Sequence, residues 1–444
     1  MPQRSPDSPE SSHTNIRSPR ARLFGPFASN ADFLRCWFGE GVSQVGTQIS
    51  LIAIPIIAAI TLDAPPIQLG LVAACGQLPA LLFGLFAGEW LDRRKRLPVM
   101  IGADLLRALI SLIIPLAALF DRLSIPLLCI VLFMLGSLTI VFDVANLSYI
   151  PSLVRRSELV AANSRLEATT SSAQVVGPAV GGMLVGLLTG PGALLIDAGS
   201  FIVSALALRR IEKPELEPAA PAVHEPLRER IGGGLRFVMD NPVLRALAAC
   251  SAASNLAGFA FLAVYVAFMA RELGLSDFEI GLVFATGGIG ALVGSILAGK
   301  CANRWGTGPA LIRAQLGFGL TGLLVPLAVL FPAAALPLVV AAEFLQWLTL
   351  LIYAVNAVSL RQRLATDEMQ GRLHATFAVL TRGVQPIGSI LGGLIASVIG
   401  LSLTLVVSEI GMLLAALILV RSPLRHNAGV IGEATTPSTE AVLS

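Results

Sequence analysis

Three carboxylates lie inside long apolar runs of this sequence, where an ionised side chain is expensive. A charge at the centre of a membrane helix costs about 2.5–3.5 kcal/mol, so a residue retained there is a functional candidate by default. Glu40, Asp143 and Glu343 are in this position, and we interpret them as candidates for proton coupling or cation binding. The alternative for each is a buried, hydrogen-bonded residue that packs two helices together.

Other polar residues share helix faces with these three. Residues four apart on a helix are neighbours, so Gln44 extends Glu40, and Trp347 extends Glu343, into polar stripes. Three further candidates complete the set: Asn146, on the same face as Asp143; Asn255, which matches Gln44 in an internal repeat; and Arg382, which is placed to meet Glu343 or an anionic substrate.

An acid and a base also occur together in the third apolar run. Asp104 and Arg107 are three residues apart and share a helix face. We interpret them as a structural or gating ion pair in preference to a proton site. Asp197 and Glu409, two further acids in the apolar runs, are interpreted as structural.

The composition requires a lipid environment. Of the 444 residues, 55% are hydrophobic and only 13% are charged. Because a soluble domain carries roughly a quarter charged residues, this chain cannot cover a water-facing surface. The net charge of +3 provides no basic soluble face, which excludes a nucleic-acid partner. The five cysteines form no CxxC and the four histidines are isolated, so we expect no metal centre and no cofactor.

Twelve segments are long and apolar enough to cross a membrane, which takes about 20 residues each. They predict an all-α membrane protein. The expected helices are Phe33–Leu62, Ile67–Ala87, Leu97–Phe120, Ser124–Ser148, Ser157–Leu188, Pro191–Leu208, Val243–Ala270, Asp277–Gly299, Gly308–Phe331, Pro337–Leu360, Leu373–Ile399 and Leu401–Val420.

Basic residues alternate between the connections, which predicts the orientation of the chain. The turn Arg93–Arg96 has four consecutive cations, and every second connection after it is also basic. The other connections hold only Arg122 and Arg271. Since basic loops stay in the cytoplasm, we expect both termini there. Residues 1–32 and 422–444 are polar tails, which we expect to be disordered.

The two halves of the sequence resemble each other. Gly70-Leu71-Val72 recurs as Gly281-Leu282-Val283, a shift of 211 residues (281 − 70), and other matches keep this register. We therefore expect one six-helix bundle over 33–211 and another over 242–421. The linker 212–241 should contain an amphipathic helix, Pro226–Met239. Such parallel repeats are typical of transporters with a site between the halves.

Motifs in the first half resemble those of the major facilitator superfamily. The pattern Gly88-x-x-x-Asp92-Arg93-x-x-Arg96 is similar to motif A, which lies between the second and third helices of that family. The set as a whole is most similar to the branch that contains the enterobactin exporter and macrolide efflux proteins. A second pattern, Gly177-Pro178-Ala179-Val180-Gly181-Gly182, resembles part of the antiporter motif of its exporters.

The resemblance implies roles for these residues. Asp92 would accept hydrogen bonds from an opposing helix, and Arg93 and Arg96 would pair with carboxylates, so that motif A latches the cytoplasmic gate. The alternative is a topology anchor only. The second-half copy, Gly299–Arg304, has Asn303 in place of the acid, which predicts an asymmetric latch. For the glycines of the antiporter motif, the alternative is ordinary small-residue packing. The helices that carry the polar stripes line the cavity in this superfamily.

These observations predict a secondary transporter and no enzyme. We expect proton-coupled efflux of a hydrophobic or amphipathic small molecule, such as a siderophore, macrolide or other drug, by alternating access. Its setting would be the cytoplasmic membrane of a bacterium, with the lipid bilayer as partner and a monomer as the working unit. Two alternatives stay open: a proton-coupled importer of a small metabolite, and a membrane sensor or scaffold that transports nothing.

Overall fold

The structure is a computed structural model, and it describes residues 27, 30–84, 87–215, 227–365 and 367–426. Within these residues twelve helices are long and apolar enough to cross a membrane, so the expected all-α membrane fold is confirmed. Most of both polar tails lies outside the described residues.

Six membrane helices form the first bundle and six form the second. The first bundle consists of α2 (Ala31–Ile56, continued by the π-helix Ile57–Thr61), α3 (Pro66–Phe83), α5 (Arg96–Ser111) with α6 (Ile113–Leu119), α7 (Ile125–Leu153), α8 (Leu159–Leu188) and α9 (Gly190–Arg209). The second consists of α11 (Pro242–Arg271), α12 (Asp277–Trp305), α13 (Thr307–Gly322) with α14 (Leu324–Leu327), α15 (Ala335–Leu364), α16 (Asp367–Arg382) with α17 (Gln385–Ile399), and α18 (Leu401–Val420).

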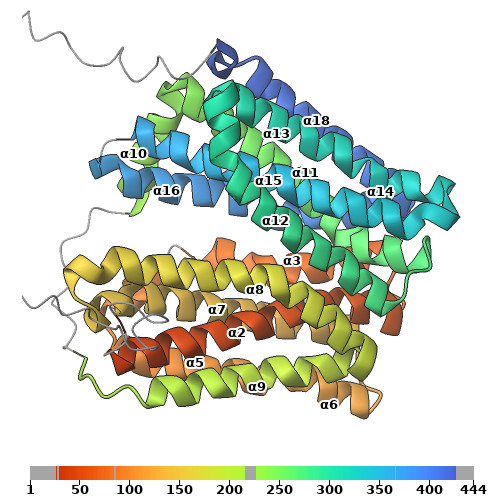
Figure 1. Cartoon of the computed structure of the whole chain (residues 1–444). Helices are drawn as coiled ribbons and strands as arrows, with labels where there is room; N and C mark the ends of the chain where they lie inside the picture. Colours follow the sequence, from red (N-terminus) through yellow and green to blue (C-terminus); the bar gives the residue numbers. More distant parts are fainter. Residues whose placement is uncertain (1–26, 28–29, 85–86, 216–226, 366, 427–444) are drawn as a thin grey trace, which may run out of the picture.

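The bundles lie side by side and touch mainly where α3 packs on α17 and α8 packs on α12 (Figure 1). Glycines make both crossings. A Cβ added to Gly182 would collide with the backbone of Gly281, and one added to Gly70 would collide with the α17 backbone near Gly393. The two crossings are repeats of each other, because the shift of 211 residues takes 70 to 281 and 182 to 393. Small residues let the four backbones approach closely.

The apolar core is shared at one end of the molecule and divided at the other. We call the end with the arginine-rich connections and the linker the basic end, and its opposite the far end. One cluster joins both bundles toward the far end, with Ile57 and Leu69 beside Val264 and Val283. At the basic end each bundle has a separate cluster. The bundles accordingly diverge toward the end that carries α16 in Figure 1.

A cationic side chain ties the far end together. Arg271, at the end of α11, donates to the carbonyl oxygens of Ala59 (2.6 Å) and Ala64 (2.9 Å) of the first bundle. It also lies 3.0 Å from a carboxylate oxygen of Asp63. Because two of these partners are backbone carbonyls, the contact depends on the position of the loop more than on its side chains.

Two expected connections are helical. The segment Gly88–Arg96 was expected to form a turn, but a short helix α4 (Ala87–Asp92) occupies most of it, and α5 begins at Arg96. Its second-half copy, Gly299–Arg304, is the last part of α12, which ends only at Gly306 with a φ of 85°. A helix that leaves the apolar layer still satisfies its backbone internally, so it continues until a residue that tolerates positive φ ends it.

One expected helix is broken. The segment Leu373–Ile399 divides into α16 and α17 around Gly383 and Val384. Pro386 lies in the first turn of α17, where its missing N–H costs no hydrogen bond within the helix, and it therefore favours a new helix start after Gly383. A further helix, α10 (Leu227–Asp240), lies in the linker and packs on α16 and α11.

Candidate functional site

Glu40 is bound to the neighbouring helix in the first bundle. It lies half-buried on α2, and its Oε2 accepts a hydrogen bond of 2.7 Å from Nδ2 of Asn146 on α7. The Sγ of Cys36 donates to the other side of the same amide at 3.6 Å. Two of the predicted residues are therefore in direct contact. Gln44, one turn further along α2, is half-buried.

The predicted pair of Asp104 and Arg107 is present and buried. Asp104 is 0% and Arg107 3% exposed, and the guanidinium donates to Oδ1 of Asp104. Phe142 and Phe201 cover the guanidinium, with ring centroids at 4.3 and 4.5 Å. Cation–π contacts of this kind strengthen when they are desolvated. Arg107 is also within electrostatic range of Asp197, so one cation serves more than one buried acid.

Asp143 faces open space rather than the core. Its side chain is exposed, and it lies within electrostatic range of Arg107 and of Arg382 in the other bundle. Arg382 is exposed at the end of α16, next to the helix break. The expected contact between Arg382 and Glu343 is absent, because Glu343 is buried among neutral donors. Opposite charges on the two bundles thus face each other without forming an ion pair.

Glu343 is enclosed by two aromatic donors. It is 4% exposed on α15, and its carboxylate accepts from the Tyr265 hydroxyl at 2.9 Å and from the Trp347 indole N–H at 2.8 Å. Asn255 lies in a separate group, where it accepts from Gln385 at 3.1 Å just after the helix break. Sequence reasoning missed Tyr265 and Gln385, because each lies far along the chain from its partner.

The glycines of the α8 motif mediate helix packing. A Cβ on Gly177 would collide with the side chain of Gln48, and one on Gly181 would crowd Ile49. Gly182 makes the crossing with α12 described above. Pro178 is half-buried within the continuous helix. These contacts describe close packing against α2 and α12, and they include one of the two junctions between the bundles.

The motif at the basic end is held by the linker. The Asp92 side chain lies outside the described residues, Arg93 is exposed, and Gly88 has open space around it. Arg96 and Leu97 donate their backbone N–H groups to the carboxylate of Glu215, at 2.7 and 3.1 Å. Through these two hydrogen bonds Glu215 caps the start of α5, and its side chain is only 6% exposed. The sequence contained no signal for this contact.

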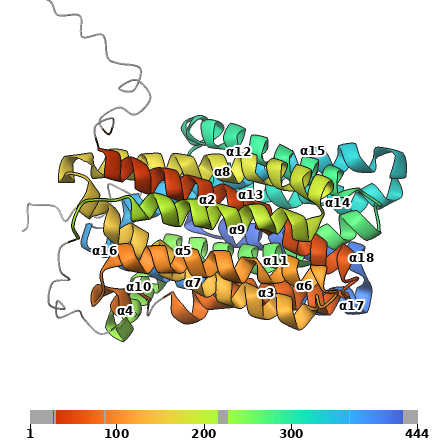
Figure 2. The ribbon, with the colours of Figure 1, turned by 90° about the horizontal axis from the view of Figure 1, so that it is seen from below.

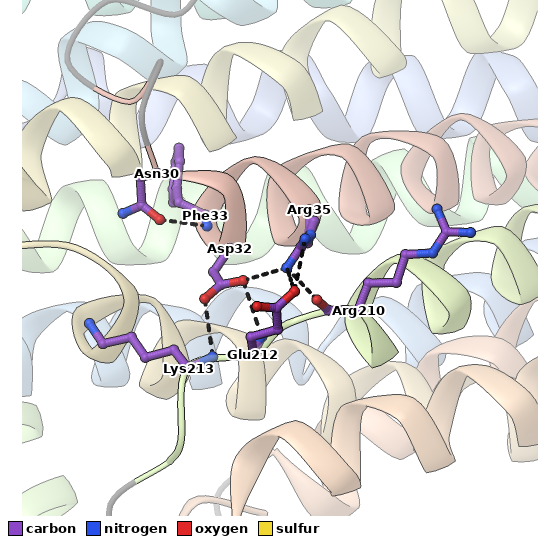
Figure 3. A network of polar contacts seen from close by, with 7 residues as sticks. All are labelled: Asn30, Asp32, Phe33, Arg35, Arg210, Glu212 and Lys213. Carbon is purple, nitrogen blue, oxygen red and sulfur yellow. Dashed lines mark hydrogen bonds and ion pairs between the residues drawn. The ribbon is translucent and has the colours of Figure 1, made fainter.

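A second group of contacts fixes the beginning of the linker (Figure 3). Asp32 accepts from the backbone N–H groups of Glu212 and Lys213, at 3.2 and 3.1 Å. Arg35 pairs with Asp32 at 2.9 Å and donates to the carbonyl oxygen of Arg210. The chain leaving α9 is therefore attached to the start of α2.

A lateral cavity of about 830 Å³ lies on the outer face of the first bundle. Its lining residues come from α2, α8 and α9, and α2 lies between the other two helices in Figure 2. Its lining is almost entirely apolar, and Trp37, Val45 and Val176 contribute to it. None of the predicted polar candidates lines it, so it is separate from the polar groups between the bundles. No group of three or more metal-ligating side chains occurs among the residues that the structure describes.

The chain forms two six-helix bundles that are related by an internal repeat, and acidic and amide side chains lie on helices of both. This arrangement is typical of secondary transporters. The chain belongs to the transmembrane secretion effector family of the major facilitator superfamily, which its residues 21–441 match. The resemblance inferred from the motifs is therefore confirmed.

Curated relatives of the chain are efflux proteins. It is 27% identical to the multidrug efflux pump Tap of Mycolicibacterium fortuitum, over 87% of this chain and 94% of the relative. It is 24% identical to macrolide efflux protein A of Streptococcus pyogenes, over 83% and 90%. It is 29% identical to the enterobactin exporter EntS of Shigella boydii, over 56% and 58%.

A solved structure shares the fold. A bacterial homologue of the iron transporter ferroportin, in its inward-facing state, matches with a TM-score of 0.72 and 18% identity, over 88% of this chain and 98% of that one. The outward-facing structure of the ferroportin homologue matches with a TM-score of 0.57.

Proposed function

We propose that the chain is a proton-coupled exporter of hydrophobic or amphipathic small molecules that works by alternating access in the bacterial cytoplasmic membrane. The observation that carries the proposal is the apolar core, which both bundles share at the far end and which is divided at the basic end. With both termini in the cytoplasm, this arrangement is an inward-facing state. The names of the three relatives favour export, and macrolides, siderophores and other drugs are the substrate classes.

In this scheme the segments 33–211 and 242–421 rock as rigid bodies, and the two glycine crossings are close while the far end is closed and separate when it opens. Closing the basic end would bring Asp143 toward Arg382, since the two lie on opposite bundles. A proton on Asp143 would remove that attraction, which couples protonation to the state of the gate. Arg93 and Arg96 of motif A would take part in the same closure. Glu40 and Glu343 are the candidate proton sites within each bundle.

Transport by the purified protein tests this function. Proteoliposomes should accumulate or expel one macrolide, one catecholate siderophore and one lipophilic dye, each with and without an imposed proton gradient. We expect gradient-dependent movement of at least one probe toward the side that corresponds to the cell exterior. Movement in the opposite direction would favour an importer, and no movement of any probe would contradict a transporter of these substrates.

Two matched variants test the mechanism. Asp143→Asn keeps the size and polarity of the side chain but cannot ionise, so we expect weaker gradient dependence with retained probe binding. Asp121, in a far-end connection, provides the control, because Asp121→Asn makes the same chemical change at an exposed site away from the bundle interface. Equal pH profiles of the two variants would contradict a coupling role for Asp143.

A further inference from the structure

A second buried carboxyl lies behind Glu343. Glu409 of α18 is 1% exposed, and its Oε1 accepts a hydrogen bond of 2.9 Å from Nε2 of Gln346. Gln346 follows Glu343 by three residues on α15, so the two share a helix face, and Glu343 lies within electrostatic range of Glu409. The Oε2 atom of Glu409 is buried and has no hydrogen-bond partner. The backbone of Gly322 on α13 lies against the same carboxyl, so a Cβ at position 322 would collide with Glu409.

No cation neutralises these two acids. Every hydrogen-bond donor to Glu343 and Glu409 is a neutral side chain, and no guanidinium or ammonium acts on either across the described residues. The helices packed on α18 carry few ionisable groups. On α11, Tyr265 lies within electrostatic range of both acids, Arg245 and Arg271 lie toward its two ends, and Cys250 is a buried thiol. Arg313 of α13 stacks on Trp305, Arg425 and His426 lie past the end of α18, and α14 and α17 contain none.

The buried acids of the first bundle do have a cation. The guanidinium of Arg107 pairs with Asp104 and lies within electrostatic range of Asp197. In the second bundle the position that corresponds to Arg107, 211 residues later in the chain, is occupied by Phe318. The partner acid Asp104 corresponds in the same way to Gln315, which is neutral. The second bundle therefore lacks both members of that ion pair, and its own buried carboxyls, Glu343 and Glu409, lie on other helices.

Isolated ions are not stable in such a place. An uncompensated carboxylate in a protein interior costs several kcal/mol, and two neighbouring ones add their repulsion. A bound proton removes the charge and turns the carboxyl into a donor, so that the acid can satisfy its own surroundings. We infer that Glu343 and Glu409 form one two-carboxyl proton-binding site in the second bundle, with Glu409 as its inner member.

The inference rests on the proposed proton coupling and specifies where in the second bundle the proton resides. Glu343 is the outer member, covered by the partly exposed ring of Trp347. In the exchange a carboxylate of the pair takes a proton from water on the extracellular side and returns it to cytoplasmic water. No other bond forms or breaks.

Infrared spectroscopy tests the site without any substrate. The purified full-length protein in lipid nanodiscs should show the C=O stretch of a protonated carboxyl at neutral pH. We expect Glu409→Gln to lose part of that band and Glu272→Gln, the same change at an exposed acid just after α11, to keep it whole. Glu409→Asp retains the acid, so its band should persist at a changed frequency. A band identical to that of the wild type in both Glu409 variants would overturn the inference.

Transport separates this inference from the proposed function. With ethidium as the probe, the ethidium gradient supported by a given pH gradient reports the number of protons exchanged per probe. We expect this number to fall by one in Glu409→Gln and to stay unchanged in Glu272→Gln. A wild-type protein that moves ethidium without any pH dependence would overturn both proposals. Coupling that is the same in the wild type and in Glu409→Gln would overturn only the two-carboxyl site.

Discussion

Replacing Gly182 by alanine should move the protein away from the conformation described here. The new Cβ would occupy the space of the Gly281 backbone, so α8 and α12 must separate. Overpacking a close contact costs about 1–3 kcal/mol. Alanine also stabilises a helix by about 1 kcal/mol over glycine, but it does so in every conformation of the transporter and thus leaves their ratio unchanged. The population of the state with a closed far end, relative to the other conformations, should therefore fall by about 5- to 150-fold.

Gly186 provides the matched control. It lies one turn further along α8, and a Cβ there would meet only Phe278 at an ordinary 3.6 Å. Gly186→Ala therefore reports the gain in helix propensity without the clash. If Gly182→Ala acts by the clash, Gly393→Ala, at the repeat-related crossing, should have the same effect, because its Cβ would press on the α3 backbone.

Spin labels at exposed positions on the two bundles measure the equilibrium. Arg156, just before α8, and Arg363, near the end of α15, both lie at the basic end and are exposed. Double electron–electron resonance between labels at these sites, in a cysteine-free background, gives the populations of long and short distances. We expect Gly182→Ala to deplete the long distances and Gly186→Ala to leave them unchanged. An unchanged distribution in Gly182→Ala would refute the crossing as a contact that is specific to the state with a closed far end.

Three further changes have defined outcomes. Arg107→Gln should lower the free energy of unfolding by about 3–5 kcal/mol, because it strands a buried aspartate, and thermal unfolding measures the loss. Arg271→Gln should weaken the far-end closure by about 1.5–3 kcal/mol in the spin-label assay, whereas Asp63→Asn, whose side chain is 89% exposed, should change it little. Glu215→Gln should weaken the α5 cap by about 0.5–2 kcal/mol in thermal unfolding, while the 83% exposed Glu212 serves as its control; equal losses in both variants would contradict the cap.

Sequence reasoning succeeded where a local rule was sufficient. The twelve spans follow from length and hydrophobicity, because only a helix satisfies its backbone within lipid. The pair of Asp104 and Arg107 follows from a spacing of three. The repeat shift, read from Gly70 and Gly281, also relates the two glycine crossings that join the bundles. Each of these inferences needed only neighbours in the chain or a comparison of the chain with itself.

The missing contacts connect segments that are distant in sequence. Glu215 reaches Arg96 across 119 residues, and Tyr265 reaches Glu343 across 78. Neither spacing is visible in a helical pattern, which extends only to the fourth residue. For the same reason the sequence could not show that Arg382 does not contact Glu343, and its alternative partner, an anionic substrate, stays a prediction. The position of Arg382 depends on the break at Gly383, and that break redirects the basic-end half of the helix.

The interpretation of Glu409 as structural illustrates what the repeat adds to the geometry. Taken alone, a buried acid bonded to Gln346 is an ordinary packing residue. Compared with the first bundle, where Arg107 lies beside the buried acids, Glu409 has only a neutral donor among the described residues, and Phe318 occupies the position 211 residues after Arg107. A fixed guanidinium holds its carboxylate charged throughout a transport cycle, whereas a carboxyl without one must exchange a proton to change its charge. In the first bundle Arg107 neutralises the charge of the buried carboxylates. In the second bundle, where no cation acts on Glu343 or Glu409 among the described residues, a bound proton can neutralise that charge instead.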